Sequence, residues 1–299
     1  MAFKDIIGQK KAINILLGTM ARNRIPSAYL FAGESGIGKK LTAINLAKTL
    51  NCLKPKTPID CCDECPSCKK IDSQTHPDFL MTAPEKGEIR VDEIRRIEEF
   101  LKTLEEPPPQ SIIILISASP DRLPETIRSR CSRINFSPLA PEQCKEVIRA
   151  IDNQDTEITD SQLSTLSRLS MGRPGLAVSS DLMEERDWFF NLFGEMSGGR
   201  NKETWADKEE MELWFNKAFI LLRDIAVLKI TGKSGMLINT DLKDRFTEMS
   251  KTIEMKDIID IYGRLSFLKG YLGFNLNKSI TWNYVTIIMQ NLKLKTGAK

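Results

Sequence analysis

The chain has 299 residues, which is too long for one ordinary domain and suits two or three. Hydrophobic residues make up 41% and charged residues 28%, so a folded protein is expected and a disordered one is excluded. The formal net charge of +3 is too small to demand nucleic acid as a direct partner. No apolar run is long enough to span a bilayer, and the N-terminal stretch carries charges throughout, which predicts a cytoplasmic protein with no membrane partner.

The first predicted elements surround a glycine-rich loop. A helix is expected over residues 6–20, a short apolar strand over 28–32 and a second helix over 39–50. The loop between the strand and the second helix spans residues 33–38. A strand, a glycine loop and a helix follow one another in the order that a phosphate-binding site requires.

The loop itself fits the pattern G-x-x-x-x-G-K, with Gly33, Gly36 and Gly38 followed by Lys39. Glycines let the backbone curl until several N–H groups point at one phosphate, and the following helix adds its positive dipole end. Lys39 is placed to reach the terminal phosphates. ATP or ADP is therefore the expected ligand, and the alternative is a glycine-rich turn that binds nothing.

A cluster of cysteines follows the second helix. It has the pattern C-x9-C-x2-C-x2-C and consists of Cys52, Cys62, Cys65 and Cys68. Because cytosolic disulfides are rare and four thiolates close a tetrahedral site, the pattern predicts a structural Zn²⁺ rather than a catalytic one. Cys61 is left as an alternative to Cys62, and reduced, unligated thiols are the other interpretation. His76 precedes Pro77 and is expected to be a loop residue rather than a further ligand.

Two features predict that this phosphate loop does not support hydrolysis. Lys40 stands where Ser or Thr normally binds Mg²⁺, and Thr42 lies about 200° around the helix and faces away. An apolar strand is expected over 112–116, buried on both faces of a parallel sheet, yet it is followed by Ser117 rather than by an acidic residue. Nowhere do four apolar residues precede Asp-Glu. Metal-assisted hydrolysis thus lacks both its hydroxyl and its carboxylate.

Two arginines are candidates for contact with phosphate. Arg130, in Ser-Arg-Cys at the end of a short predicted helix, is placed to project from the domain edge toward a neighbouring subunit's nucleotide. Arg173, in Gly-Arg-Pro-Gly at the start of another helix, is placed to reach back to a phosphate. The alternative for each is an ordinary arginine that faces water.

The remainder of the chain is predicted to be helical. A helix over 91–104 ends at the prolines of 107–109, and a helical unit begins at Pro141. After residue 186 the pattern stays helical, with apolar residues on one stripe: Trp214, Ala218, Leu221, Leu222 and Ile225. The predicted fold class is α/β plus all-α, divided into a phosphate-loop domain with a parallel sheet (1–138), a small helical lid (139–185) and a C-terminal helical domain (186–299).

Taken together, these features resemble the AAA+ clamp-loader ATPase family of bacterial DNA polymerase III. The resemblance covers nearly the whole chain and rests on short stretches as well as on the phosphate loop. These stretches are Ile7-Gly8-Gln9, 28–31, the four-cysteine insert, His76-Pro77-Asp78, 101–108 and 123–131.

The resemblance implies a function and a set of roles. Arg130 corresponds to the family's arginine finger, which acts on the adjacent subunit's ATP, and Arg173 to its second sensor; Ser117 stands near the first sensor position. The C-terminal domain corresponds to the collar of a heteropentamer, whose partners are the gamma/tau and delta subunits and, through the complex, the sliding clamp and primed DNA. Lys40 and the Gly-Arg-Pro-Gly form favour the delta-prime type, which generally does not hydrolyse ATP.

The chain departs from the family at Phe100. The resemblance implies a strand, an Asp-rich turn and a helix between the helix that begins at Val91 and Leu101-Lys102-Thr103; these are absent here, so a shortened first domain is expected. A natural deletion and an incomplete sequence both account for this. Two other functions are compatible with the sequence: an ATP-hydrolysing gamma/tau-type subunit, and a zinc-stabilised scaffold that binds no nucleotide.

Overall fold

The computed structural model describes two compact units, which are treated separately. The described residues are 2–55, 57, 59–82, 108, 110–151, 159–179, 181–197, 205–272, 274 and 276–296. Unit 1 comprises residues 1–156 and 170–179, and unit 2 comprises 157–169 and 180–299. The predicted helix over 91–104 and the junction at Phe100 lie outside the described residues. The contacts group α6 (Pro141–Ile151) and α8 (Pro174–Ser179) with unit 1 and α7 (Asp160–Leu169) with unit 2, and the predicted division into three parts stays a prediction.

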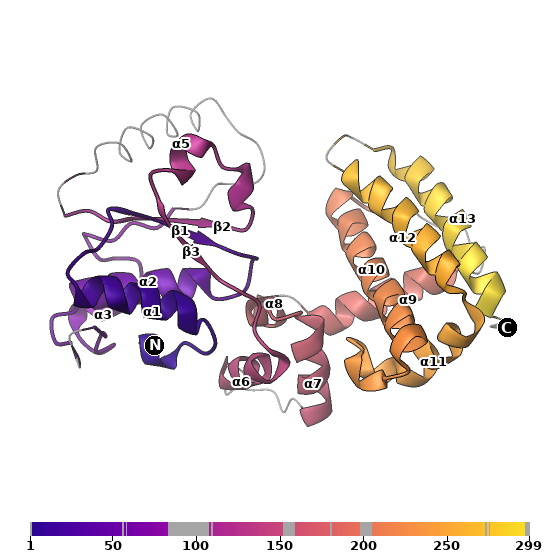
Figure 1. Ribbon diagram of the computed structural model, residues 1–299, viewed down its shortest axis with the longest axis horizontal. Helices are drawn as coiled ribbons and strands as arrows, with labels where there is room; N and C mark the ends of the chain where they lie inside the picture. The colour runs from indigo at the N-terminus through magenta and orange to yellow at the C-terminus, as the bar shows by residue number, and fades with distance from the viewer. Residues whose placement is uncertain are drawn as a thin grey trace. The chain divides into compact units, whose positions relative to one another are not determined.

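Unit 1 is built on a parallel sheet. The strands are β1 (Ala28–Ala32), β2 (Ile113–Ser117) and β3 (Ser132–Asn135), in the order β2-β1-β3. β1 lies in the centre, with Ala32 opposite both Ser117 and Asn135. All three strands therefore end at the same edge, where the glycine loop leaves β1 (Figure 1). This is the parallel α/β arrangement predicted for the first part of the chain.

Helices cover both faces of this sheet. Because side chains alternate along a strand, Tyr29 and Phe31 pack on α1 and α2, whereas Ala28 and Leu30 pack on α5. The helices of unit 1 are α1 (Lys10–Ala21), α2 (Lys39–Asn51), α3 (Pro66–Asp72), α5 (Glu125–Arg128), α6 (Pro141–Ile151) and α8 (Pro174–Ser179), with 3-10 turns at Phe3–Asp5 and Pro120–Arg122.

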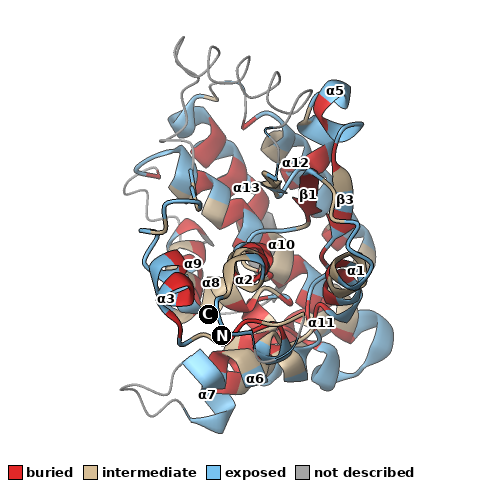
Figure 2. Ribbon diagram, turned by 90° about the vertical axis from the view of Figure 1, so that its left-hand side faces the viewer, coloured by how far each residue is buried: buried red, intermediate tan, exposed pale blue. Residues whose placement is uncertain are grey.

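Two expectations about unit 1 are corrected. β1 is buried along its whole length (Figure 2). β2 is only half-buried and Ile116 is 44% exposed, so β2 is not buried on both faces. Among the described strands, β2 has a neighbour on one side only, which explains the exposure. The first helix begins at Lys10 rather than Ile6, because Gly8 has φ +89° and interrupts the helix.

Gln9 at the start of α1 joins distant parts of unit 1. Its side chain is buried, and its Nε2 donates to the carbonyls of Ile37 (3.1 Å) and Ser137 (2.8 Å). Its Oε1 accepts from the N–H of Ser137 at 3.2 Å. The Gly8-Gln9 pair thus fixes the N-terminal segment against both the glycine loop and the chain that leaves β3.

Unit 2 is helical throughout its described residues. Its helices are α7 (Asp160–Leu169), α9 (Leu182–Ser197), α10 (Lys208–Thr231), α11 (Lys243–Thr252), α12 (Met255–Gly270) and α13 (Lys278–Thr296), with 3-10 turns at Ser234–Met236 and Thr240–Leu242. Asp207 caps α10 by accepting from the N–H of Glu210 (2.8 Å), and Gly232 ends it at φ +65°. The predicted stripe of α10 is confirmed as core, with each member at most 1% exposed. Of the helices in the described ranges, none has the length and apolar character needed to cross a bilayer.

Candidate functional sites

The glycine loop between β1 and α2 has the backbone of a phosphate nest. Gly33, Gly36 and Gly38 have φ of +148°, +79° and +100°, values that other residues rarely adopt. At Gly33 there is also no room for a side chain, since a Cβ would lie 2.6 Å from the carbonyl oxygen of Phe136. The loop therefore keeps the curled shape that points backbone N–H groups toward an anion.

Lys39, the first residue of α2, is folded into this loop. It is 5% exposed, and its Nζ donates to the carbonyls of Gly33 (2.5 Å) and Glu34 (2.6 Å). Burial lowers the pKa of Lys39, and the nearby Glu34 carboxylate opposes part of that shift. In this state the Lys39 ammonium holds the loop closed and does not project into open space.

Lys40 behaves differently from its neighbour. It is exposed and lines the cavity beside the loop. Thr42 is fully buried, and its hydroxyl donates to the carbonyl of Gly38 at 2.9 Å. As the helical spacing indicates, Thr42 faces away and does not replace the hydroxyl that is missing at Lys40.

The start of α8 lies directly on the loop. The N–H of Gly175 donates to the carbonyl of Gly36 at 2.9 Å, and a Cβ on Gly175 would lie 2.9 Å from the Cα of Gly36. Arg173 adds an ion pair, with its Nη1 3.3 Å from Oε2 of Glu34. The structure thus brings Arg173 to the phosphate loop. Nothing in the sequence pattern pointed to Glu34 as its partner.

A cavity of about 390 Å³ opens between the loop, the N-terminal segment and α6. Its polar lining includes Asp5, Ser35, Lys39 and Lys40, and its remaining wall is largely apolar. That apolar wall was not predicted; it comprises Ile6, Ile7, Ile37, Leu41, Ile116, Leu139, Val147, Ala150, Ile151 and Pro174. Ile7, Ile37, Ile116 and Pro174 lie in segments that the sequence patterns singled out, but those patterns did not indicate that they share one wall. An apolar cavity with a few charged groups is typical of a small-molecule site.

Among the described residues, no carboxylate stands where β2 ends. The Ser117 hydroxyl accepts from the N–H of Ser119 at 3.1 Å, and the Ser117 carbonyl accepts from the N–H of Gly33 at 3.2 Å. The next acidic residue along the chain, Asp121, pairs with Arg133 at 3.6 Å. Within the described residues, this end of the sheet offers the phosphate loop no acidic side chain that could hold Mg²⁺.

Arg130 lies on the surface of unit 1, just after α5. Its side chain is exposed, and its Nη1 donates to the carbonyl of Thr126 at 2.8 Å. That bond holds the guanidinium against the end of α5. The structure does not place Arg130 beside the phosphate loop of its own chain: it is absent from the lining of the cavity.

The cysteine pattern forms a compact cluster. The sulfurs of Cys52, Cys62, Cys65 and Cys68 all lie within 4.8 Å of one another, a grouping that could hold a metal ion. Tetrahedral Zn²⁺ with bonds of about 2.3 Å requires sulfurs about 3.8 Å apart, so the cluster fits such an ion. Cys52 ends α2 and Cys65 caps α3, and a short loop between these helices carries Cys62.

Backbone N–H groups point at these sulfurs. The N–H of Cys62 donates to Sγ of Cys52 and that of Cys65 to Sγ of Cys62, both at 3.3 Å. Burial opposes ionisation of Cys65, but N–H groups of Cys68 and Leu53 and the neighbouring thiols outweigh it and lower the Cys65 pKa to about 6. Such donors favour the thiolate form that metals bind.

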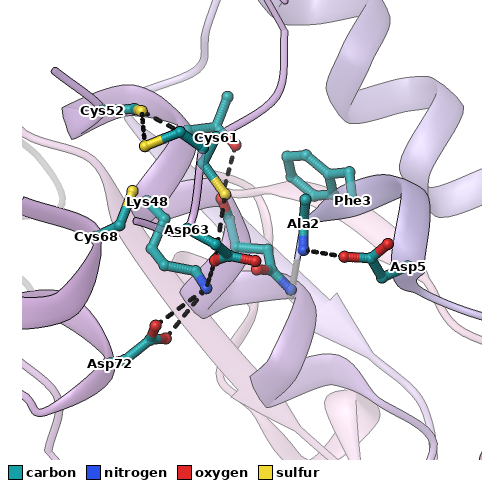
Figure 3. Close-up of polar contacts among 12 residues, drawn as sticks. Ala2, Phe3, Asp5, Lys48, Cys52, Cys61, Asp63, Cys68 and Asp72 are labelled. Carbon is teal, nitrogen blue, oxygen red and sulfur yellow. Dashed lines mark hydrogen bonds and ion pairs between the residues drawn. The ribbon is translucent and has the colours of Figure 1, made fainter. Parts of the chain in front are cut away.

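Cys61 points away from the cluster. Its sulfur lies 3.7 Å from Oδ1 of Asp63, and Asp63 pairs with the buried Lys48 of α2 (Figure 3). Lys48 also pairs with Asp72 of α3 at 3.1 Å. Burial alone would lower the pKa of Lys48, but the two carboxylates outweigh it and raise that pKa. Lys48 therefore ties α2 to the loop that carries Cys62 and to the end of α3.

His76 takes no part in the sulfur cluster. Its Nε2 lies 3.0 Å from the Ser67 hydroxyl, and its Nδ1 accepts from the N–H of Asp78 at 3.1 Å. These contacts orient the chain after α3, which agrees with the loop role expected for His76.

Unit 2 presents an exposed apolar surface along α12 and α13. A groove of about 740 Å³ lies between them, and we call it the α12–α13 groove. Its lining is Ile259, Asp260, Gly263, Arg264, Phe267, Leu268, Leu276, Asn277, Ile280, Thr281 and Tyr284. Ile259, Phe267 and Ile280 are 64%, 66% and 69% exposed. A cluster of large apolar side chains this open to solvent is typical of an interaction surface.

Comparison with known proteins relates the first part of the chain to a described protein family. A family model described as DNA polymerase III, delta subunit, matches residues 8–101 and 98–140. The match falls in two pieces that overlap at residues 98–101, around Phe100, where a segment is predicted to be absent. Such a match would result from a shortened first domain.

Individual relatives are subunits of the same polymerase. The delta-prime subunit of Bacillus subtilis is 25% identical over 273 residues, covering 78% of this chain and 82% of the relative. The delta-prime subunit of Pseudomonas aeruginosa is 32% identical over 203 residues, covering 57% and 60%. The tau subunit of Escherichia coli is 32% identical over 215 residues, covering 62% of this chain but only 33% of the relative.

Proposed function

We propose that this chain, a delta-prime-type clamp-loader subunit of DNA polymerase III, assists ATP hydrolysis in its complex without hydrolysing ATP itself. It assembles with other AAA+ subunits of the gamma/tau and delta types into a heteropentamer. It donates Arg130 to the nucleotide of a neighbouring subunit. The complex then loads the sliding clamp onto primed DNA.

The main support for this proposal is the presence of a lysine, Lys40, at the position of the usual Mg²⁺-binding hydroxyl. The loop around it keeps the curled backbone of a phosphate site, yet an ammonium group stands where a hydroxyl would ligate Mg²⁺. Ser117 at the end of β2 supplies no carboxylate in compensation. A chain that can surround a phosphate but cannot hold the metal contributes to turnover on another subunit's nucleotide.

The position of Arg130 supports its assignment as the arginine finger. It is exposed and lies outside the cavity of its own chain, so its own phosphate loop does not require it. Its bond to Thr126 keeps the guanidinium at the edge of unit 1. A guanidinium supplied by a neighbour stabilises charge on the transferring phosphoryl group and typically accelerates hydrolysis about 10³-fold or more.

A structural Zn²⁺ is part of the proposal. Cys52, Cys62, Cys65 and Cys68 would hold it, and four thiolates leave no open position for catalysis. The ion would close the loop between α2 and α3. Because α2 begins at Lys39, zinc would also stabilise the helix that follows the phosphate loop.

The α12–α13 groove is the proposed seat of a partner subunit's helical domain. Its lining is apolar on α12 at Ile259 and Phe267 and on α13 at Ile280. Burying such a face against another helical domain is the ordinary means by which helices associate in water.

The test is reconstitution with gamma/tau and delta partners, sliding clamp and primed DNA. Arg130→Ala should leave assembly intact and lower clamp-stimulated ATPase about tenfold or more, because a neighbour loses its transition-state cation. Arg122→Ala, at an exposed arginine before α5, is the matched control and should leave the rate unchanged. An Arg130→Ala complex with full activity would refute the arginine-finger role.

Two alternatives are separated by simpler measurements. The 32% identity to a tau subunit favours an ATP-hydrolysing gamma/tau-type subunit, for which the purified chain alone would show Mg²⁺-dependent turnover. A zinc-stabilised scaffold would assemble with its partners but bind no nucleotide, and a nucleotide titration identifies it.

A further inference from the structure

The two lysines at the start of α2 differ in burial and in hydrogen bonding. Lys39 is buried, and its ammonium is engaged by two loop carbonyls. Lys40 is exposed, lines the same cavity and has neither a hydrogen bond nor an ion pair among the described residues. The cavity therefore has one cation that holds the loop together and a second that is available to a ligand.

The surrounding charges leave that second cation uncompensated. Asp5 is the carboxylate in the described lining of the cavity, and its Oδ2 accepts from the N–H of Ala2 at 2.7 Å. Glu34 lies at the loop but is paired with Arg173 at 3.3 Å. An anion that enters beside the loop meets the ammonium of Lys40 and the N–H groups of the nest.

We infer that Lys40 takes the place of Mg²⁺, so that this loop binds a nucleoside diphosphate without a divalent metal. The inference goes beyond the proposed function and rests on the curled backbone of the loop and on the cavity beside it. In an ordinary phosphate loop the hydroxyl at this position ligates a metal that neutralises the phosphate oxygens. Here the side chain itself carries the positive charge and three N–H donors.

A diphosphate suits the site better than a triphosphate. Mg²⁺ normally bridges the last two phosphates of ATP, and an ammonium at its position repels the metal. Arg173 is engaged by Glu34 and is not available to a third phosphate unless that pair opens. The apolar wall formed by Ile6, Val147 and Ile151 provides a surface for the base.

The test is fluorescence titration of the full chain with mant-ADP. Magnesium is omitted in one arm and present in the other; EDTA is avoided because it would remove zinc from the thiolates. Wild type should bind equally well in both arms. Lys40→Thr, which restores the consensus hydroxyl, should bind about tenfold more weakly without Mg²⁺ because it loses a charge-assisted hydrogen bond, and should regain affinity when Mg²⁺ is added. Lys11→Thr, at an exposed lysine of α1, makes the same charge change as a control.

Three results would overturn the inference. One is wild-type binding that strengthens about tenfold on addition of Mg²⁺, as expected of an ordinary phosphate loop. Another is equal behaviour of Lys40→Thr and Lys11→Thr. The third is an absence of binding by the wild type in both arms. The proposed function is judged separately, by the ATPase of the reconstituted complex, which requires no nucleotide on this chain.

Discussion

Arg173 pairs with Glu34, with 3.3 Å between Nη1 and Oε2, so a residue at the start of α8 is joined to the phosphate loop after β1. The Arg173 side chain is 22% exposed and the Glu34 side chain 58%. The backbone bond from Gly175 to Gly36 lies beside this pair. Together the two contacts hold α8 on the loop, and a ligand's phosphate would compete with Glu34 for Arg173.

Removing the charge of Glu34 should strengthen binding of an anion. Glu34→Gln keeps the shape of the side chain, releases Arg173 and removes a carboxylate that repels phosphate. Because the pair is partly exposed, the expected gain in mant-ADP affinity is modest, about threefold. Glu125→Gln on α5 makes the same charge change outside the cavity and should have no effect. Weaker binding by Glu34→Gln would mean that Glu34 helps to hold the ligand.

Adding a methyl group at Gly175 should separate α8 from the loop. A Cβ there would lie 2.9 Å from both the Cα and the carbonyl oxygen of Gly36, which is too close for either atom. Gly175→Ala is expected to lower the free energy of unfolding of unit 1 by about 1–3 kcal/mol. Gly194→Ala on α9, where a Cβ meets nothing within 4 Å, should be neutral or stabilising by up to about 1 kcal/mol.

Far-UV circular dichroism is the suitable measurement for that comparison. All four tryptophans, Trp188, Trp205, Trp214 and Trp282, belong to unit 2, so tryptophan fluorescence does not report on unit 1. A Gly175→Ala protein as stable as wild type would show that α8 can leave the loop at no cost.

Serine substitutions should identify the zinc ligands. Cys62→Ser removes one of the four clustered sulfurs and should abolish retention of zinc through purification, with loss of stability in unit 1. Cys61→Ser, at the adjacent cysteine whose sulfur lies by Asp63, should retain the zinc content of wild type. Atomic emission spectroscopy measures both. Loss of zinc from Cys61→Ser with retention in Cys62→Ser would reverse the assignment.

A charge in the α12–α13 groove should block assembly. Phe267 is 66% exposed, so Phe267→Glu should change the free energy of unfolding by no more than about 0.5 kcal/mol. Placing a carboxylate in an apolar interface should weaken binding to partner subunits about tenfold or more. Ile230→Glu, at a 73% exposed position of α10 outside the groove, is the control. Size-exclusion chromatography of the reconstituted complex would contradict the prediction if both variants assemble equally.

Local patterns predicted much of the fold. The strand Ala28–Ala32 lies where its apolar run indicated, and the stripe containing Trp214 and Ile225 is core. These features depend on spacing within a few residues, which the sequence displays directly. The expected burial of β2 was wrong because burial depends on which strands lie beside it, and in the described sheet β2 has one neighbour.

The start of the first helix could not be predicted from the sequence for a different reason. The predicted segment opened at Ile6 with Gly8-Gln9, but the helix begins at Lys10 because Gly8 adopts a left-handed conformation and Gln9 bonds to Ile37 and Ser137. Those partners are distant in the sequence. Only the folded chain brings them to the Gln9 side chain.

The sequence by itself determined the chemistry of the phosphate loop: glycines that allow its backbone, and a lysine at position 40 where a metal-binding hydroxyl is usual. Tertiary structure decided what surrounds that loop. It paired Arg173 with Glu34, supplied the apolar wall of the cavity and brought the sulfur of Cys62, rather than that of Cys61, into the cluster. Residue identity and short spacing fix which groups are present, whereas contacts between distant segments depend on how the whole unit packs.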